Sequence, residues 1–134
     1  MRKITSIDSR KKNADKIDSI LRDLMSMQGV TAAAIVDKDG LVTHIRRNFE
    51  INTDALGVSV QIVFGAASRA ASHVNHHSAD IVICENSDGY VLLAPIVAGF
   101  MLSLVTEDDA LLGRVRFELK EAIPSLKKLF VDHI

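Results

Sequence analysis

The segment from Thr53 to Asn75 carries more apolar surface than a single packing face of a helix can use. Thr53 is a suitable N-terminal cap, and Asp54 follows in the first turn, where the helix dipole favours an anion. At about 100° per residue, the apolar side chains of this segment sweep an arc of roughly 240°. A helix that lies on one sheet needs a much narrower apolar arc. The sequence therefore predicts a helix with two burial faces.

The first of these faces can lie on the domain's own sheet, and it is centred on Leu56, Val63, Ala67 and Val74. The second face has side chains that let another helix approach closely: Val58, Ile62, Ala66 and Ala70. A self-complementary pair of helices across a twofold axis is the economical way to cover it. The alternative is a monomer in which another element of this chain covers the second face. In the dimer, Arg69 at the margin of this face and His73 near its end are expected contacts.

Apolar spacing divides the rest of the chain into short elements. Residues 1–13 mix basic and hydroxyl side chains without an apolar period, so we expect a flexible basic arm before one domain over 14–134. Apolar residues at helical spacing predict helices over about 15–29 and 112–130. Short apolar runs bounded by turn residues predict strands at 30–37, 41–46, 79–85, 90–97 and 100–106. The expected order is αββαβββα, an α/β fold of the α+β type.

Composition excludes several classes of function. A formal net charge of −1 is too small for a general electrostatic hold on nucleic acid. No apolar run reaches the roughly 18 to 20 residues of a membrane span, so membrane insertion is not expected. The single cysteine, Cys84, cannot form an internal disulfide, and the first residues do not resemble a secretion signal. We therefore expect a protein of the reducing cytoplasm.

Several short motifs occur in a characteristic order: Met27-Gln28-Gly29-Val30, then Val36 to Val42, the Ala-rich helix, Asp88 to Pro95, and Leu111-Leu112-Gly113. From about Ala14 to Phe130 the chain resembles the roadblock / light-chain-seven family (dynein light chain roadblock-like), in its prokaryotic GTPase-regulator form. The resemblance implies a profilin-like sandwich: a five-stranded antiparallel sheet with helix two on one face and helices one and three on the other. Family members dimerise by pairing second helices and third strands. Transferred here, residues 79–85 form the edge strand and bring Ile81 and Ile83 into the dimer interface.

The resemblance also implies a function, namely regulation of Ras-like small GTPases, assembly of scaffolds or linkage of cargo to a motor. We expect a homodimer, or a heterodimer with a homologous domain, that binds a Ras-like GTPase. Exposed residues of the paired helices are the expected partner contacts: Gln61, Ser68, Arg69 and Ser72. Two alternatives stay open, a purely structural adaptor and a small-ligand sensor with a pocket between sheet and helices.

Catalytic motifs are missing from the sequence. There is no GxxxxGK[ST] loop, no GxGxxG after a strand and no GxSxG elbow, so we expect neither an enzyme nor a bound cofactor. His73, His76 and His77 are the one cluster with ligand chemistry, because His73 and His77 are one helical turn apart. Histidines near a helix C-terminus also interact well with the dipole without any ligand. We therefore expect no metal site, and a role for these histidines at the dimer contact stays a hypothesis.

Overall fold

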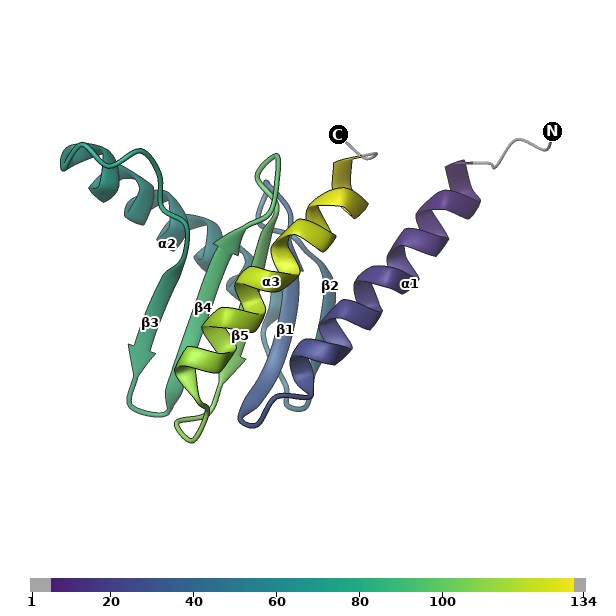
Figure 1. Ribbon diagram of the computed structural model, residues 1–134, viewed down its shortest axis with the longest axis horizontal. Helices are drawn as coiled ribbons and strands as arrows, with labels where there is room; N and C mark the ends of the chain where they lie inside the picture. The colour runs from purple at the N-terminus through teal and green to yellow at the C-terminus, as the bar shows by residue number, and fades with distance from the viewer. Residues whose placement is uncertain (1–5, 132–134) are drawn as a thin grey trace.

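The computed structural model describes residues 6–131, with side chains from Arg10 onward. Its elements follow the predicted order αββαβββα, which is confirmed (Figure 1). They are α1 (Ser6–Met25), β1 (Val30–Val36), β2 (Val42–Arg47), α2 (Thr53–His73), β3 (Val82–Asn86), β4 (Gly89–Pro95), β5 (Met101–Thr106) and α3 (Leu112–Val131). No helix in the described part of the chain is long and apolar enough to cross a membrane.

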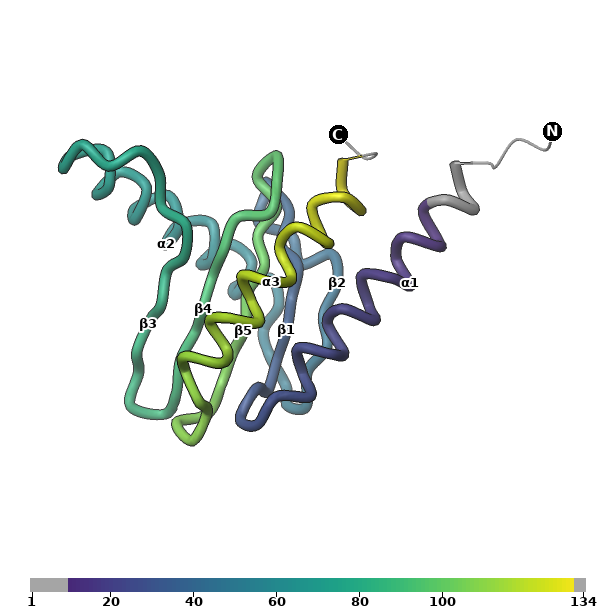
Figure 2. The backbone as a smooth tube through the Cα atoms, in the orientation of Figure 1, coloured from purple at the N-terminus to yellow at the C-terminus, as the bar shows by residue number. Residues whose placement is uncertain are grey.

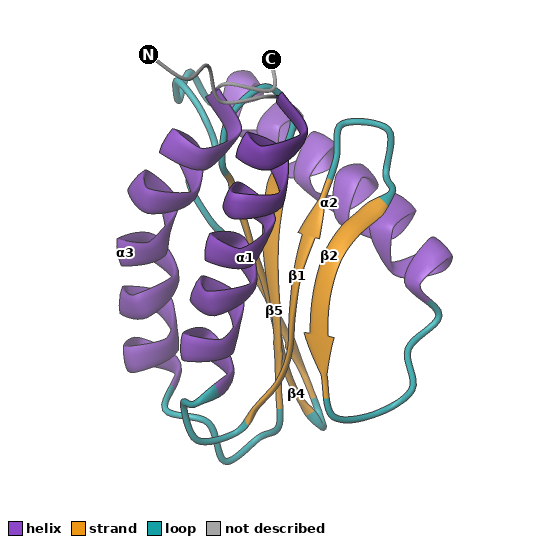
Figure 3. Ribbon diagram, turned by 90° about the vertical axis from the view of Figure 1, so that its right-hand side faces the viewer, coloured by secondary structure: helices purple, strands orange, loops and turns teal. Residues whose placement is uncertain are grey.

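The five strands form one antiparallel sheet in the order β2-β1-β5-β4-β3. β2 and β3 are the two edges, so the expectation that the third strand lies at an edge is confirmed. Figure 3 shows α1 and α3 side by side on one face of the sheet and α2 on the other. This is the sandwich that the resemblance implied.

The hydrophobic core is divided unequally between the two faces. The larger part lies between the sheet and the pair α1 and α3, and its fully buried members include Leu21, Ile35, Leu92, Leu104 and Leu119. The smaller part lies beneath α2, and its buried members are Val36, Val60, Leu93 and Met101. Most of the apolar burial that stabilises the fold therefore comes from the face that α2 does not occupy.

The first helix begins earlier than its apolar spacing indicated. α1 starts at Ser6 instead of about Asp15, so the basic residues at 10–12 lie in a helix. Lysine and arginine are good helix formers, and a helix continues through them beyond its packed face. Asn13 also connects this part to the end of α3, because its Nδ2 donates to the Leu129 carbonyl oxygen at 3.3 Å. The division into an arm over 1–13 and a domain over 14–134 stays a prediction, and residues 1–5 lie outside the described residues.

A glycine pair fixes where α2 sits on the sheet. Gly57 is buried, and a Cβ added to it would overlap the carbonyl oxygen of Gly40 and lie 2.9 Å from the carbonyl carbon. Gly40 lies in the turn between β1 and β2 with φ of +85°, a conformation that favours glycine. The turn and the first half of α2 are therefore in backbone contact.

Candidate interaction surface

An apolar row on α2 faces away from the sheet. The outer face of α2, as we call it, consists of Val58, Ile62, Ala66, Ala70 and, in the last turn, His73, and Arg69 lies at its margin. All six are exposed in the isolated chain, and the exposed fractions of Val58 and Ile62 are 50% and 65%. Large apolar side chains at this exposure, aligned along one helix, are typical of a surface that a partner covers.

The second half of α2 has little contact with its own domain. The helix packs on β2, β1 and β5, and its buried residues are Gly57 and Val60, both in the first half. Figures 1 and 2 show the helix continuing past the β3 edge of the sheet. Val74, which was expected to lie on the sheet, is 59% exposed. That expectation is wrong for Val74 because it follows the last residue of α2, at the end that projects beyond the sheet, whereas Leu56 and Val63 of the same face do pack on the smaller core.

The sheet next to this half of α2 is also incompletely covered. Strand register places Val82 opposite Leu93 and Cys84 opposite Val91. Because side chains alternate between the two faces, these residues share the α2 face with buried Leu93. Val82, Cys84 and Val91 remain half-buried. The outer end of the α2 face therefore presents apolar strand residues beside a projecting helix.

The predicted strand contacts lie elsewhere. Ile81 and Ile83 are half-buried and pack against the larger core, under α1 and α3. The structure does not bring their side chains together with the outer face of α2. The sequence alone did not identify Val82 and Cys84 as the strand residues on the α2 face, because it did not fix the strand register. Alternation of side chains along the strand that contains Leu93 was the signal that could have found them.

The expected partner contacts divide into two groups. Arg69 and Ser72 are exposed, and the Ser72 hydroxyl donates to the Arg69 carbonyl oxygen at 2.8 Å. Gln61 and Ser68 are half-buried. Gln61 Nε2 donates to the carbonyl oxygens of Asp37 at 2.7 Å and of Gly99 at 2.9 Å. The expectation that Gln61 and Ser68 are exposed is wrong, and the Gln61 amide joins two turns of the sheet to α2.

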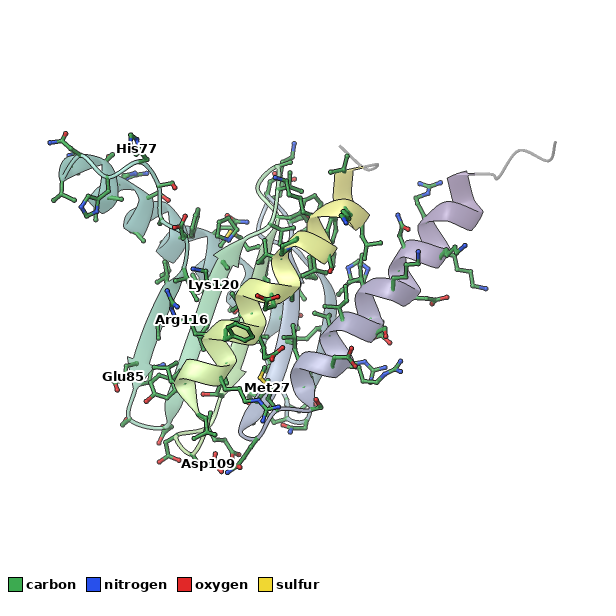
Figure 4. The ribbon with its side chains drawn as sticks, in the orientation of Figure 1. Met27, His77, Glu85, Asp109, Arg116 and Lys120 are labelled. Atoms are coloured by element: carbon green, nitrogen blue, oxygen red, sulfur yellow. The ribbon has the colours of Figure 1, made fainter. Side chains whose placement is uncertain are left out.

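The three histidines gather where α2 ends. His73 is in the last turn, and the His76 backbone N–H donates to the Ala71 carbonyl oxygen at 2.9 Å, which closes the helix end. Figure 4 shows His77 at this projecting end, away from the sheet. Within residues 6–131, no group of three or more His, Cys, Asp or Glu side chains is arranged to hold a metal ion. The arrangement fits an exposed helix terminus.

A charged contact on the opposite face joins α1 to the other sheet edge. Arg46 on β2 donates to both carboxylate oxygens of Asp18, at 2.7 and 2.8 Å. Hydrogen bonds from Arg46, and secondarily from Arg22, lower the pKa of Asp18 to about 2. Nearby, burial lowers the pKa of His44, against an opposing effect of the Asp18 charge. This cluster holds α1 on the sheet and is remote from the outer face of α2.

Comparison with known proteins agrees with this architecture. A sequence model of the Roadblock/LC7 domain matches residues 16–106. The uncharacterised protein MJ0310 of Methanocaldococcus jannaschii is 27% identical over 114 residues, which cover 85% of this chain and 99% of that protein.

Solved structures share the fold at low sequence identity. A structure of MglB with a tetrameric arrangement has a TM-score of 0.84 at 17% identity, covering 91% of this chain and 93% of that one. The gliding protein MglB from Thermus thermophilus has a TM-score of 0.78 at 18% identity, covering 90% of each chain.

Proposed function

Because the chain belongs to the Roadblock/LC7 domain family, we propose that it is a non-catalytic dimeric module that binds and modulates a Ras-like small GTPase. The observation that carries the proposal is the exposed outer face of α2, on a helix whose second half has no buried residue. A module of this kind acts through the surface it presents, and the roadblock resemblance implies regulation of Ras-like GTPases.

Twofold symmetry supports pairing of the α2 helices. If the axis passes beside Ala66, an antiparallel pair places Val58 against the partner's Val74 and Ile62 against the partner's Ala70. These residues are all exposed in the single chain. Ala66 and Ala70 are small, so the two helices can approach closely. The same pairing brings the partner helix toward half-covered Val82 and Val91.

The β3 edge supports a larger contact. An edge strand presents unpaired backbone N–H and C=O groups, which pair readily with another strand. Pairing two β3 edges across the same axis makes one continuous sheet under the two helices. In this arrangement Ile81 and Ile83 lie near the junction but on the face of α1 and α3.

The GTPase contact is proposed on the side of α2 that stays exposed once the helices pair. Arg69 and Ser72 lie at the margin of the outer face and are both exposed. A partner held there can have its switch loops fixed in one conformation, which changes exchange or hydrolysis without a chemical group from this chain. Arg69 contributes a planar group that fits a carboxylate on the GTPase.

The test uses a small GTPase encoded beside this chain. We expect the chain to bind one nucleotide state of the GTPase more tightly and to change its rate of GTP turnover. Arg69→Ala should weaken the effect, whereas Arg116→Ala on α3 is the matched control and should leave it unchanged. Binding and turnover that do not respond to the chain in either nucleotide state contradict the proposal. Binding without any nucleotide preference indicates the structural adaptor instead.

A further inference from the structure

A pocket lies where the first turns of α1 meet β2 and the end of α3. Its volume is about 330 Å³, and its described lining is Arg10, Asn13, Ala14, Ile17, Thr43, His44, Phe100 and Phe130. The lining residues come from α1, β2, α3 and the turn before β5, on the side of the sheet opposite α2. This volume is in the range of small-molecule sites, which span about 300 to 1,000 Å³.

The inner wall of this pocket is aromatic. The rings of Phe100 and Phe130 have centroids 4.5 Å apart at an interplanar angle of 30°. His44 meets Phe130 edge-on, with centroids 6.4 Å apart at 82°. Phe130 and Ile17 are buried, whereas Phe100 and Ala14 are only half-buried. The wall therefore offers a planar or branched apolar group a firm surface to pack on.

The polar groups of the pocket favour an anion. Arg10 is an exposed member of the lining, and none of the described lining residues carries a carboxylate. Burial lowers the pKa of His44, so its ring stays neutral at pH 7, and Thr43 Oγ1 lies 3.0 Å from its Nδ1. Asp18, whose charge acts on His44, is held by Arg46. The guanidinium of Arg10 carries five N–H donors, so it can donate to a ligand while it also contacts another group of the protein.

We propose that this pocket binds a small monocarboxylic acid whose aromatic or branched body packs on Phe100 and Phe130 and whose carboxylate meets Arg10. The site is independent of the outer face of α2 and goes beyond the proposed GTPase function. It adds a place where a metabolite of this class contacts α1, the sheet and α3 at once.

The experiment titrates the full chain with phenylacetate, followed by calorimetry and by NMR shifts of backbone amides. We expect saturable binding with shifts at Ala14, Thr43 and Phe100. Arg10→Gln should weaken binding about tenfold, because hydrogen bonds between ionised groups are the strong class. Lys11→Gln, the adjacent exposed cation outside the described lining, is the matched control and should change affinity less than about twofold. The neutral analogue phenylacetamide should bind about tenfold more weakly than the acid.

A filling substitution tests the location. Ala14→Phe occupies the pocket from a half-buried helical position and should abolish phenylacetate binding while circular dichroism stays helical. If Ala14→Phe does not fold, the affinity of the exposed Arg10→Gln variant for phenylacetate still tests the proposal. The proposal is overturned if wild type does not bind phenylacetate. It is also overturned if acid and amide bind equally, or if Lys11→Gln costs as much as Arg10→Gln.

Discussion

Replacing Gly57 by alanine should destabilise the fold, because it places one methyl group against a turn whose backbone is held rigidly in place. The added Cβ would overlap the Gly40 carbonyl oxygen and lie 3.4 Å from Val42 Cγ2. The turn is held by several hydrogen bonds. The Gly40 N–H donates to the Asp37 carbonyl oxygen at 3.0 Å, and the Asp37 carboxylate accepts two backbone N–H groups at 2.9 Å each. Relief of the overlap therefore requires movement of α2.

The magnitude follows from two opposing effects. Overpacking by one methyl group in a well-packed site costs about 1 to 3 kcal/mol, and a rigid backbone neighbour favours the upper end. Alanine in place of glycine inside a helix gains about 0.5 to 1 kcal/mol. We therefore expect Gly57→Ala to lower the free energy of unfolding by about 2 kcal/mol.

Urea denaturation at one fixed protein concentration measures this change, because the stability of a dimer depends on concentration. Gly65→Ala on the same helix is the matched control. Nothing lies within 4 Å of a Cβ at Gly65, so this variant should gain about 0.5 to 1 kcal/mol. A Gly57→Ala protein as stable as wild type, or equal losses in both variants, would refute the reasoning.

Three further outcomes are expected. Arg46→Met should return the pKa of Asp18 from about 2 toward its ordinary value in an NMR titration, and an unchanged pKa would contradict the contact. Since that pKa is lowered by folding, wild type should lose the stabilisation as pH falls from about 4 to about 2, and Arg46→Met should lose less. Burial lowers the pKa of His44, so the folded state resists protonation, and stability should fall as pH drops below about 6.5. The His44→Gln variant should show a smaller fall, and an equal one would count against the burial argument. The N-terminal cap of α2 is Asn52 and not Thr53 as expected, because Asn52 Oδ1 accepts from the Ala55 N–H at 3.1 Å. Asn52→Ala should therefore cost about 1 kcal/mol in urea denaturation, whereas no loss would exclude the cap.

Local patterns in the sequence were sufficient for the order of elements and for the outer face of α2. Val58, Ile62 and Ala66 recur every four residues, so their shared side of the helix follows from helical geometry alone. The strands could likewise be predicted, because turn residues mark both ends of each short apolar run. These features depend on neighbours along the chain, which is why a single sequence could predict them.

Contacts between distant segments could not be predicted. Helical spacing puts Gln61 on a polar, solvated side of α2, but its amide donates to carbonyl groups of Asp37 and Gly99, which are remote in sequence. The close contact at Gly57 could not be predicted for the same reason, because only the folded sheet brings Gly40 against it. Strand register is a tertiary property too, and a one-residue difference separates Val82 on the α2 face from Ile83 on the other.

The most direct test of the account is the molar mass of the protein in solution by size-exclusion chromatography with light scattering. We predict twice the chain mass of 14.6 kDa for wild type, and the chain mass for Ile62→Arg, because pairing would bury an unpaired charge. Phe117→Arg is the matched control, since Phe117 is similarly exposed at 58% but lies on α3, and it should stay a dimer. A wild-type protein that elutes at the chain mass, or an Ile62→Arg variant that remains a dimer, would contradict the central claim that the outer face of α2 is an interface.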